Sequence, residues 1–394
     1  MVRPLWLAGV LGCSRGEVLF AGGAGARGIV ESAGYEFVEL PVLESAEFFR
    51  RVNRARFPYG AGDLRRYVRA ELDLLESRGP ALVVGDFRLS LSISCGLAGV
   101  PFANLCNAHW SPHYALRYPP PDMLIPRLLG PRLSSSLIMP MVFRRLARDF
   151  DRVAREFGMG TLSDLREVYT RGDWTLYPDV PGLAPTRGAP DSHRYLGPVL
   201  WEPDTPMPRW ERLLDSSAKR AYVSMGSSGD RRVLGRVIEA LLALGCEVLV
   251  TAEPADLRRG PGDGVFAAPM LPGIKAAAMC DIVVCHGGSG TVYQALSKAR
   301  PVLGLTSNPD QQLVMNGIEH AGAGTMMPAR RASFERVRRE ALRLLQSTDA
   351  KRAAHAAAAE IRAHDAARRF ALFVQETTGA PAADREPLAA HTAF

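Results

Sequence analysis

The chain has 394 residues, a length that predicts two or three domains. Hydrophobic residues make up 47% of it and charged residues 23%, which is typical of a globular protein and excludes general disorder. No apolar run approaches the roughly 20 residues of a membrane-spanning helix, so we expect no membrane span. The net charge of +7 comes mostly from scattered arginines that often lie beside acidic residues. This pattern favours solvated helix faces over a nucleic-acid partner.

The six cysteines show neither C-x-x-C pairs nor the spacing of a disulfide framework. Several lie in apolar runs, so we expect buried, reduced thiols in a cytoplasmic protein, and no metal site. They are Cys13, Cys95, Cys106, Cys246, Cys280 and Cys285. The apolar stretch near the start is too short for a signal peptide and has no clean cleavage site after it.

Short apolar runs alternate with amphipathic stretches along the chain, which is typical of parallel α/β sheets. A helix is expected over 62–77, where Leu64, Val68 and Leu75 recur at helical spacing. The other elements predicted in this half are a helix over 28–33 and strands over 17–21, 37–41, 81–84 and 100–105. The span 110–140 is rich in Pro, Leu and Met without periodicity, and we interpret it as a functional insertion.

A proline-rich break between 197 and 217 separates this half from a second run of alternating elements. The boundaries we predict are a first domain over 1–200, a linker over 201–217, a second domain over 218–377 and a disordered tail over 378–394. The second domain has predicted strands over 221–225, 247–251, 281–285 and 301–305, and predicted helices over 231–244, 291–298, 311–321, 334–346 and 349–377. Two doubly wound halves of this kind would face a ligand-binding cleft.

The clearest local motif runs from His286 to Thr291 (His-Gly-Gly-Ser-Gly-Thr), between a predicted strand and a predicted helix. Glycines let a backbone approach a ligand closely, and a helix start offers free N–H groups at the positive end of its dipole. His286, Ser289 and Thr291 add side-chain donors, so the motif predicts a phosphate site. The alternative is a tight glycine turn without a ligand. It is not a Walker A loop, because no lysine follows the last glycine.

A second polar group, Asp310 with Gln311, follows the next predicted strand and the Asn308-Pro309 turn. A carboxylate beside an amide suits the neighbouring hydroxyls of a sugar. The simpler interpretation makes Asp310 a helix cap. Its position, one β/α unit after the phosphate motif, favours the sugar site.

These motifs resemble the donor-binding domain of GT-B glycosyltransferases, of the bacterial natural-product type in the UDP-glucosyl/glucuronosyltransferase superfamily. The resemblance covers nearly the whole chain. It implies two Rossmann-like doubly wound domains facing a cleft, the first for the acceptor and the second for the nucleotide sugar. It also implies inverting transfer of a sugar from an NDP-sugar (UDP or dTDP) to a hydroxyl of a small-molecule acceptor, without a metal or cofactor.

By matching position, the resemblance assigns donor-binding residues in the second half. The phosphates would contact His286, Gly288, Ser289, Gly290, Thr291, Asn316 and Ser227. The sugar hydroxyls would be held by Asp310 and Gln311. The base would meet Met270 and Leu271. Helix N–H groups and His286 would carry the leaving-group charge in place of a metal.

The first half carries the same resemblance and then departs from it. In the family a histidine after the first strand acts as general base, and an aspartate at the end of a later strand orients it; Asp86 matches that aspartate. Residues 4–11 resemble the helix that follows the histidine, with Pro4 in its first turn, so the histidine position falls on Met1. We therefore expect the first strand and the base to be missing. In the alternative, residues 5–11 are themselves the first strand.

Weaker candidates lie after the strand predicted over 100–105. His109, Trp110 and His113 are placed where an acceptor could bind, although they could equally be ordinary loop residues. Trp110 and Tyr114 suggest an apolar acceptor, or simply cover the core. No oligomeric state is predicted.

The predicted function is therefore that of a hexosyltransferase. One alternative is a nucleotide-sugar epimerase of the same fold, which would need acidic groups around the sugar from both domains. Another is a non-catalytic NDP-sugar-binding protein or helper subunit, which the missing base favours.

Overall fold

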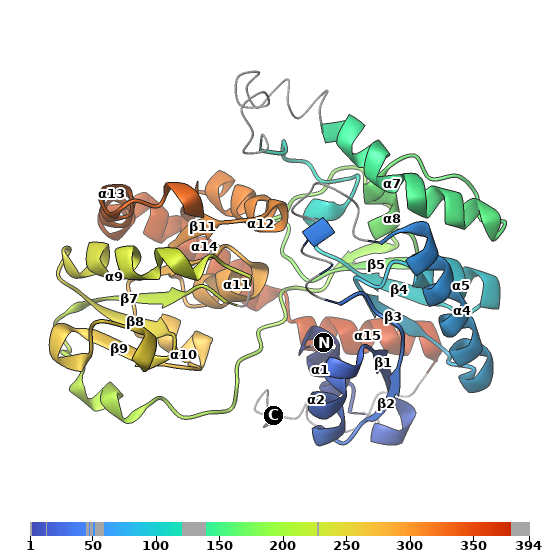
Figure 1. Cartoon of the computed structure of the whole chain (residues 1–394), viewed down its shortest axis with the longest axis horizontal. Coiled ribbons are helices and arrows are strands. Elements are labelled where there is room, and N and C mark those ends of the chain that lie inside the picture. The colour runs from blue at the N-terminus through green and yellow to red at the C-terminus, as the bar shows by residue number, and fades with distance from the viewer. Residues whose placement is uncertain are drawn as a thin grey trace.

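Two α/β halves lie side by side in the computed structural model (Figure 1). It describes residues 2–12, 14–44, 47, 50–51, 59–119, 139–226 and 228–379. Every pair of strands in its sheets is parallel, as the alternation of strands and helices predicts. Across these ranges, no helix is both long and apolar enough to cross a membrane.

The second half is built on one six-stranded sheet in the order β12-β11-β10-β7-β8-β9. Its strands are β7 (Lys219–Ser224), β8 (Cys246–Thr251), β9 (Val265–Ala268), β10 (Ile282–Cys285), β11 (Val302–Thr306) and β12 (Gly324–Pro328). Its helices are α9 (Leu234–Leu242), α10 (Gly273–Ala278), α11 (Ser289–Ser297), α12 (Pro309–His320), α13 (Phe334–Gln346) and α14 (Thr348–Ala363). The strand order reverses between β7 and β10, and open parallel sheets bind ligands beyond the carboxyl ends of the strands at such a point.

The first half has its strands in two separate sheets. One sheet pairs β1 (Leu19–Gly22) with β2 (Glu36–Glu39), and the other runs β3 (Val83–Asp86), β4 (Phe102–Leu105), β5 (Trp174–Tyr177), β6 (His193–Tyr195). The helices are α1 (Val2–Gly9), α2 (Arg27–Ser32), α4 (Ala61–Arg78), α5 (Leu91–Ala98), α7 (Met139–Glu156) and α8 (Leu165–Tyr169). Among the described residues no strand joins β1 to β3. The sheet is therefore interrupted at the position where the resemblance predicts a missing first strand. Since residues 2–9 are helical, the alternative strand over 5–11 is wrong.

The last helix, α15 (Ala366–Thr378), crosses back and lies against the first half (Figure 1). Its Phe370 and Phe373 join the core of that half beside four leucines: Leu7, Leu105, Leu176 and Leu196. The sequence predicts one long helix over 349–377, but the structure divides it into α14 and α15 at His364. There the Asp365 side chain accepts the N–H of Arg368 and caps a new helix. The predicted tail is outside the described residues from 380 onward.

Five of the cysteines are free and buried, as predicted: Cys95, Cys106, Cys246, Cys280 and Cys285. Burial raises the pKa of the Cys246 thiol to about 11, so this thiol stays protonated at neutral pH. Cys13 lies outside the described residues.

Candidate functional site

The His286–Thr291 motif lies at the point where the strand order of the second half reverses. Residues 286–288 connect β10 to α11, and Gly287 has a φ of +85°, a conformation that favours glycine. A Cβ on Gly288 would collide with the His286 ring, and a Cβ on Gly226, beyond β7, would lie 2.7 Å from it. The imidazole therefore fits between two glycine turns that leave the surrounding backbone open. This is the strand–turn–helix context that the sequence predicts.

His286 is buried, and its Nδ1 has no hydrogen-bond partner among the described residues. Burial lowers the pKa of His286, with a weaker opposing effect from the Ser224 backbone, so the ring is neutral at neutral pH. An unsatisfied buried polar atom costs about 1–3 kcal/mol. A ligand at this turn would relieve that cost, and the start of α11 beside it supplies further N–H groups.

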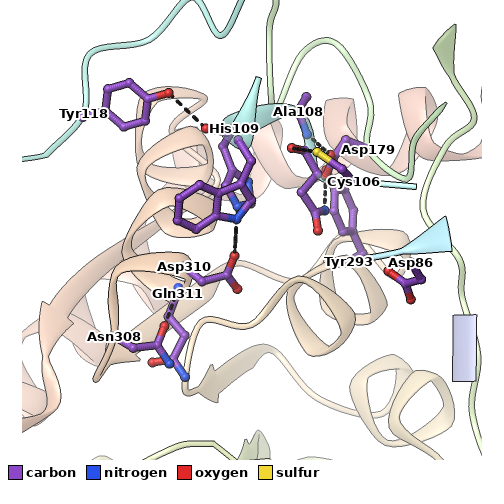
Figure 2. A network of polar contacts seen from close by, with 12 residues as sticks. Asp86, Cys106, Ala108, His109, Tyr118, Asp179, Tyr293, Asn308, Asp310 and Gln311 are labelled. Atoms are coloured by element: carbon purple, nitrogen blue, oxygen red, sulfur yellow. Dashed lines mark hydrogen bonds and ion pairs between the residues drawn. The ribbon is translucent and has the colours of Figure 1, made fainter. Parts of the chain in front are cut away.

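Asp310, in the first turn of α12, is not a helix cap. The cap is Asn308, whose Oδ1 accepts the N–H of Gln311 at 3.0 Å. Asp310 instead reaches the first half of the chain, where its Oδ1 accepts from Trp110 Nε1 at 2.8 Å and lies 3.1 Å from His109 Nε2 (Figure 2). Its side chain remains 49% exposed, so the carboxylate is open to a ligand.

The charge of Asp310 is favoured by these neighbours. Partial desolvation at the interface between the halves would raise the pKa of this half-exposed carboxyl group of Asp310, but the hydrogen bonds from His109 and Trp110 outweigh that effect. The pKa therefore lies below its ordinary value, and the group is a carboxylate at neutral pH. A charged carboxylate only accepts hydrogen bonds, which suits hydroxyl groups.

Gln311, the predicted partner of Asp310, is fully buried in the second half. Its Oε1 accepts the Ser307 N–H at 2.7 Å, and its Nε2 donates to Ser228 Oγ at 3.2 Å. The side chain thus joins the start of α12 to the turn after β7. Both ends of its amide are in use in this structure.

The other residues predicted to bind the sugar donor differ in their exposure and in their contacts. Met270 is 58% exposed beyond β9, whereas Leu271 is buried in the core and offers only its backbone. Asn316 donates through Nδ2 to the Arg117 carbonyl of the first half at 3.1 Å. Ser227 lies outside the described residues.

Asp86, at the end of β3, is paired with Arg3 of α1. Arg3 Nε donates to Asp86 Oδ2 at 3.2 Å, and a second guanidinium nitrogen contacts the other carboxylate oxygen. Arg3 also donates to Asn107 Oδ1 at 3.1 Å. Burial would lower the pKa of Arg3, but Asp86 outweighs this and raises it, so the pair is ionic. Met1, on which the predicted base position falls, lies outside the described residues.

Asp179 was not predicted as a site residue, although it lies at the interface between the two halves. Only 2% of it is exposed, and it accepts three hydrogen bonds: Asn107 Nδ2 at 2.9 Å, the Ala108 N–H at 2.7 Å and Tyr293 Oη at 2.8 Å (Figure 2). Tyr293 belongs to α11, so this carboxylate links the loop after β4 to the helix that begins at the His286 motif. An aspartate two residues after a buried strand was the available signal.

The predicted acceptor residues separate into two groups. His109 and Trp110 contact Asp310, as described above. His113 instead faces His193, with ring centroids 5.3 Å apart, and His193 Nδ1 lies 2.6 Å from Tyr177 Oη. Burial lowers the pKa of His193 to about 4, so its ring is neutral at neutral pH.

Taken together, a neutral histidine and a helix start can bind an anion, and a nearby carboxylate can accept hydroxyl donors. These two features come from neighbouring β/α units of one sheet, and the first half contacts the second of them directly. The arrangement fits a ligand that carries both phosphate and sugar groups.

The chain is similar to known glycosyltransferases. No family model matches the chain. The chain is 39% identical over 359 residues to a PGL/p-HBAD biosynthesis rhamnosyltransferase of Mycobacterium bovis BCG, covering 90% of this chain and 80% of that protein. It is 38% identical over 245 residues to an inactive PGL/p-HBAD biosynthesis glycosyltransferase of the same organism, covering 61% of this chain and 67% of that protein.

The fold is also shared with a solved structure, the spinosyn rhamnosyltransferase SpnG complexed with thymidine diphosphate. The TM-score is 0.68 at 22% identity, and the match covers 94% of this chain and 95% of that one. The predicted architecture of two Rossmann-like domains is thereby confirmed. The chain belongs to the PGL/p-HBAD biosynthesis glycosyltransferase family and has the GT-B fold.

Proposed function

We propose that this glycosyltransferase moves a sugar from a nucleoside diphosphate to a hydroxyl of a small apolar acceptor, with inversion and without a metal. The donor would bind in the second half and the acceptor in the first. The relative is named a rhamnosyltransferase, and the similar structure holds thymidine diphosphate, so dTDP-rhamnose is the first donor to test. We place the reaction in the cytoplasm, since the described cysteines are free thiols.

One observation carries the proposal. The buried, unsatisfied His286 Nδ1 lies in a glycine turn at the sheet's switch point, one β/α unit before a half-exposed carboxylate that no cap role explains. His286 would bind the diphosphate together with the N–H groups of residues 289–291. Charge developing on the leaving diphosphate would be stabilised by those donors. Asp310 would accept hydroxyls of the sugar, and Met270 would lie against the base.

Calorimetric titration with dTDP, followed by a transfer assay with dTDP-rhamnose, tests the proposal. We expect His286→Ala to weaken dTDP binding about 10- to 100-fold, the effect of losing a charge-assisted hydrogen bond in a partly buried site. His355→Ala, on the outer part of α14, is the matched control and should bind as the wild type does. Unchanged affinity in His286→Ala would refute this role. Addition of EDTA should leave transfer unaffected, and the product's anomeric configuration, read by NMR, should be opposite to the donor's.

A second candidate, a protein that binds NDP-sugars without transferring them, is favoured by one specific observation. In the described residues, Asp86 forms hydrogen bonds only with Arg3, so an arginine occupies the carboxylate that a base would use. A protonated guanidinium cannot accept a proton. Tight dTDP-rhamnose binding with neither transfer nor hydrolysis, over a panel of phenols and alcohols, would establish this candidate instead.

A further inference from the structure

The carboxylate of Asp310 is contacted by two side chains that come from the other half of the chain. His109 and Trp110 both contact one oxygen, Oδ1, while Oδ2 takes part in no hydrogen bond within the described ranges. A carboxylate has about four lone-pair positions, so Oδ2 is still able to accept. The contacts therefore fix the carboxylate's rotation and leave Oδ2 without a hydrogen-bond partner in the described residues.

The two donors are themselves held in place. His109 is almost fully buried, and its ring packs against Trp110 with centroids 5.7 Å apart. The Trp110 ring packs in turn on Tyr169, at 5.0 Å. Two aromatic rings fixed by packing make a stiffer support than flexible side chains would, because little rotamer freedom remains to be lost.

The backbone that carries these rings is anchored just before them. Asp179 accepts from Asn107 Nδ2 and from the Ala108 N–H, and its Oδ1 also accepts from Tyr293 of α11. Segment 107–110 thus contacts both helices that begin at the proposed donor site: α12 through Asp310, and α11 through Asp179 (Figure 2). The distance between the diphosphate turn and the sugar carboxylate is in this way set partly by the first half.

We propose that His109 and Trp110 are positioning residues for the donor sugar: they hold Asp310 Oδ1 so that Oδ2 faces a sugar hydroxyl. This role goes beyond acceptor binding, and it rests on the proposed function. It assigns part of the specificity for the sugar to the half that would bind the acceptor.

Comparing dTDP with dTDP-rhamnose tests the role, because only the second ligand carries the sugar. We expect Trp110→Phe to leave the Kd for dTDP within about twofold and to raise the Kd for dTDP-rhamnose about 5- to 10-fold, as one hydrogen bond to a charged group is lost. His109→Ala should behave alike, and His109→Gln, which keeps an N–H donor, should recover part of the loss. In an Asp310→Asn background, Trp110→Phe should have little further effect.

Trp174→Phe is the matched control, since Trp174 packs on Phe373 of α15, away from Asp310. Equal weakening of both ligands by Trp110→Phe would indicate a merely structural role and overturn the proposal. Tighter dTDP-rhamnose binding would also overturn it, because the rings would then compete with the sugar for Asp310. If the wild type binds dTDP but gains nothing from the sugar, this inference alone fails. If it binds neither ligand, the proposed function fails as well.

Discussion

The two halves of the molecule use their polar groups in opposite ways. In the second half, the groups at the carboxyl ends of β10 and β11 keep unused capacity: His286 Nδ1 has no partner in the described residues, and Asp310 is half exposed. In the first half, the matching carboxylate, Asp86, has both oxygens on Arg3. A ligand gains most where it satisfies an unpaired group, so we expect the stronger ligand affinity in the second half.

The largest effect is expected where the second half leaves room for a ligand. Gly288→Val would drive a branched side chain into the His286 ring, so we expect dTDP affinity to fall at least about 100-fold, roughly 3 kcal/mol. Calorimetry would measure it. Gly235→Ala in α9, where an added Cβ meets nothing within 4 Å, is the control. If the valine variant binds dTDP normally, the turn beside His286 does not bind the ligand, and the expected difference between the halves is contradicted.

The ion pair of the first half should matter for stability. Arg3→Met would leave the largely buried Asp86 carboxylate without a partner, and we expect a loss of about 2 kcal/mol in the free energy of unfolding. Arg27→Met breaks pairs whose side chains are about half exposed, and should cost much less than Arg3→Met. Urea denaturation compares the two variants. Equal losses would mean that the Asp86 pair is an ordinary surface pair.

The joint between the halves can be tested at Tyr293. Burial and then the Asp179 carboxylate raise the pKa of Tyr293 far above its ordinary value, so its hydroxyl always donates. Tyr293→Phe removes that one bond at nearly constant volume, and we expect a loss of about 1–2 kcal/mol in unfolding free energy. Tyr222→Phe is the control for coupling between the halves, because the Tyr222 hydroxyl forms its hydrogen bond with Thr251 within one sheet. Only Tyr293→Phe should loosen the joint, seen as faster hydrogen exchange in segment 107–110.

The smallest effect concerns pH. The pKa of His193 is about 4 in the folded chain, below the ordinary value of 6.5, so the unfolded state binds the proton more readily. The contribution of His193 is complete above pH 6.5 and is lost as the pH falls from 6.5 toward 4. Since the ring is partly exposed, we expect only about 1 kcal/mol. The measurement is urea unfolding at pH 7.5 and pH 5 for the wild type and His193→Gln; equal pH dependence would contradict it.

Local patterns were sufficient for most of the second half. The alternation of apolar runs and turns predicts β7, β8, β10 and β11, and the glycine motif falls at the expected switch point. Two edge strands were missed: β9 has only four residues, and β12 (Gly324–Pro328) contains glycine and proline. The first half was harder, since β5 and β6 are short, and the interrupted sheet gives no periodic signal of its own.

Contacts between distant residues could not be predicted. Arg3 meets Asp86 across 83 positions, and Trp110 meets Asp310 across 200. No spacing rule relates residues so far apart, because only the folded arrangement of the two halves brings them together. The same applies to α15, whose apolar face is visible in the sequence although its partner is not.

That final helix gives the molecule a second tether. The chain passes between the halves once through the segment around 201–217 and again at His364, before α15 packs on the first half. Two bodies joined at two points keep one easy rotation, about the line through both points, while swivelling and sliding are restrained. Opening for substrate entry should therefore be a rotation of the two halves about this line, and it would separate Asp310 from His109 and Trp110.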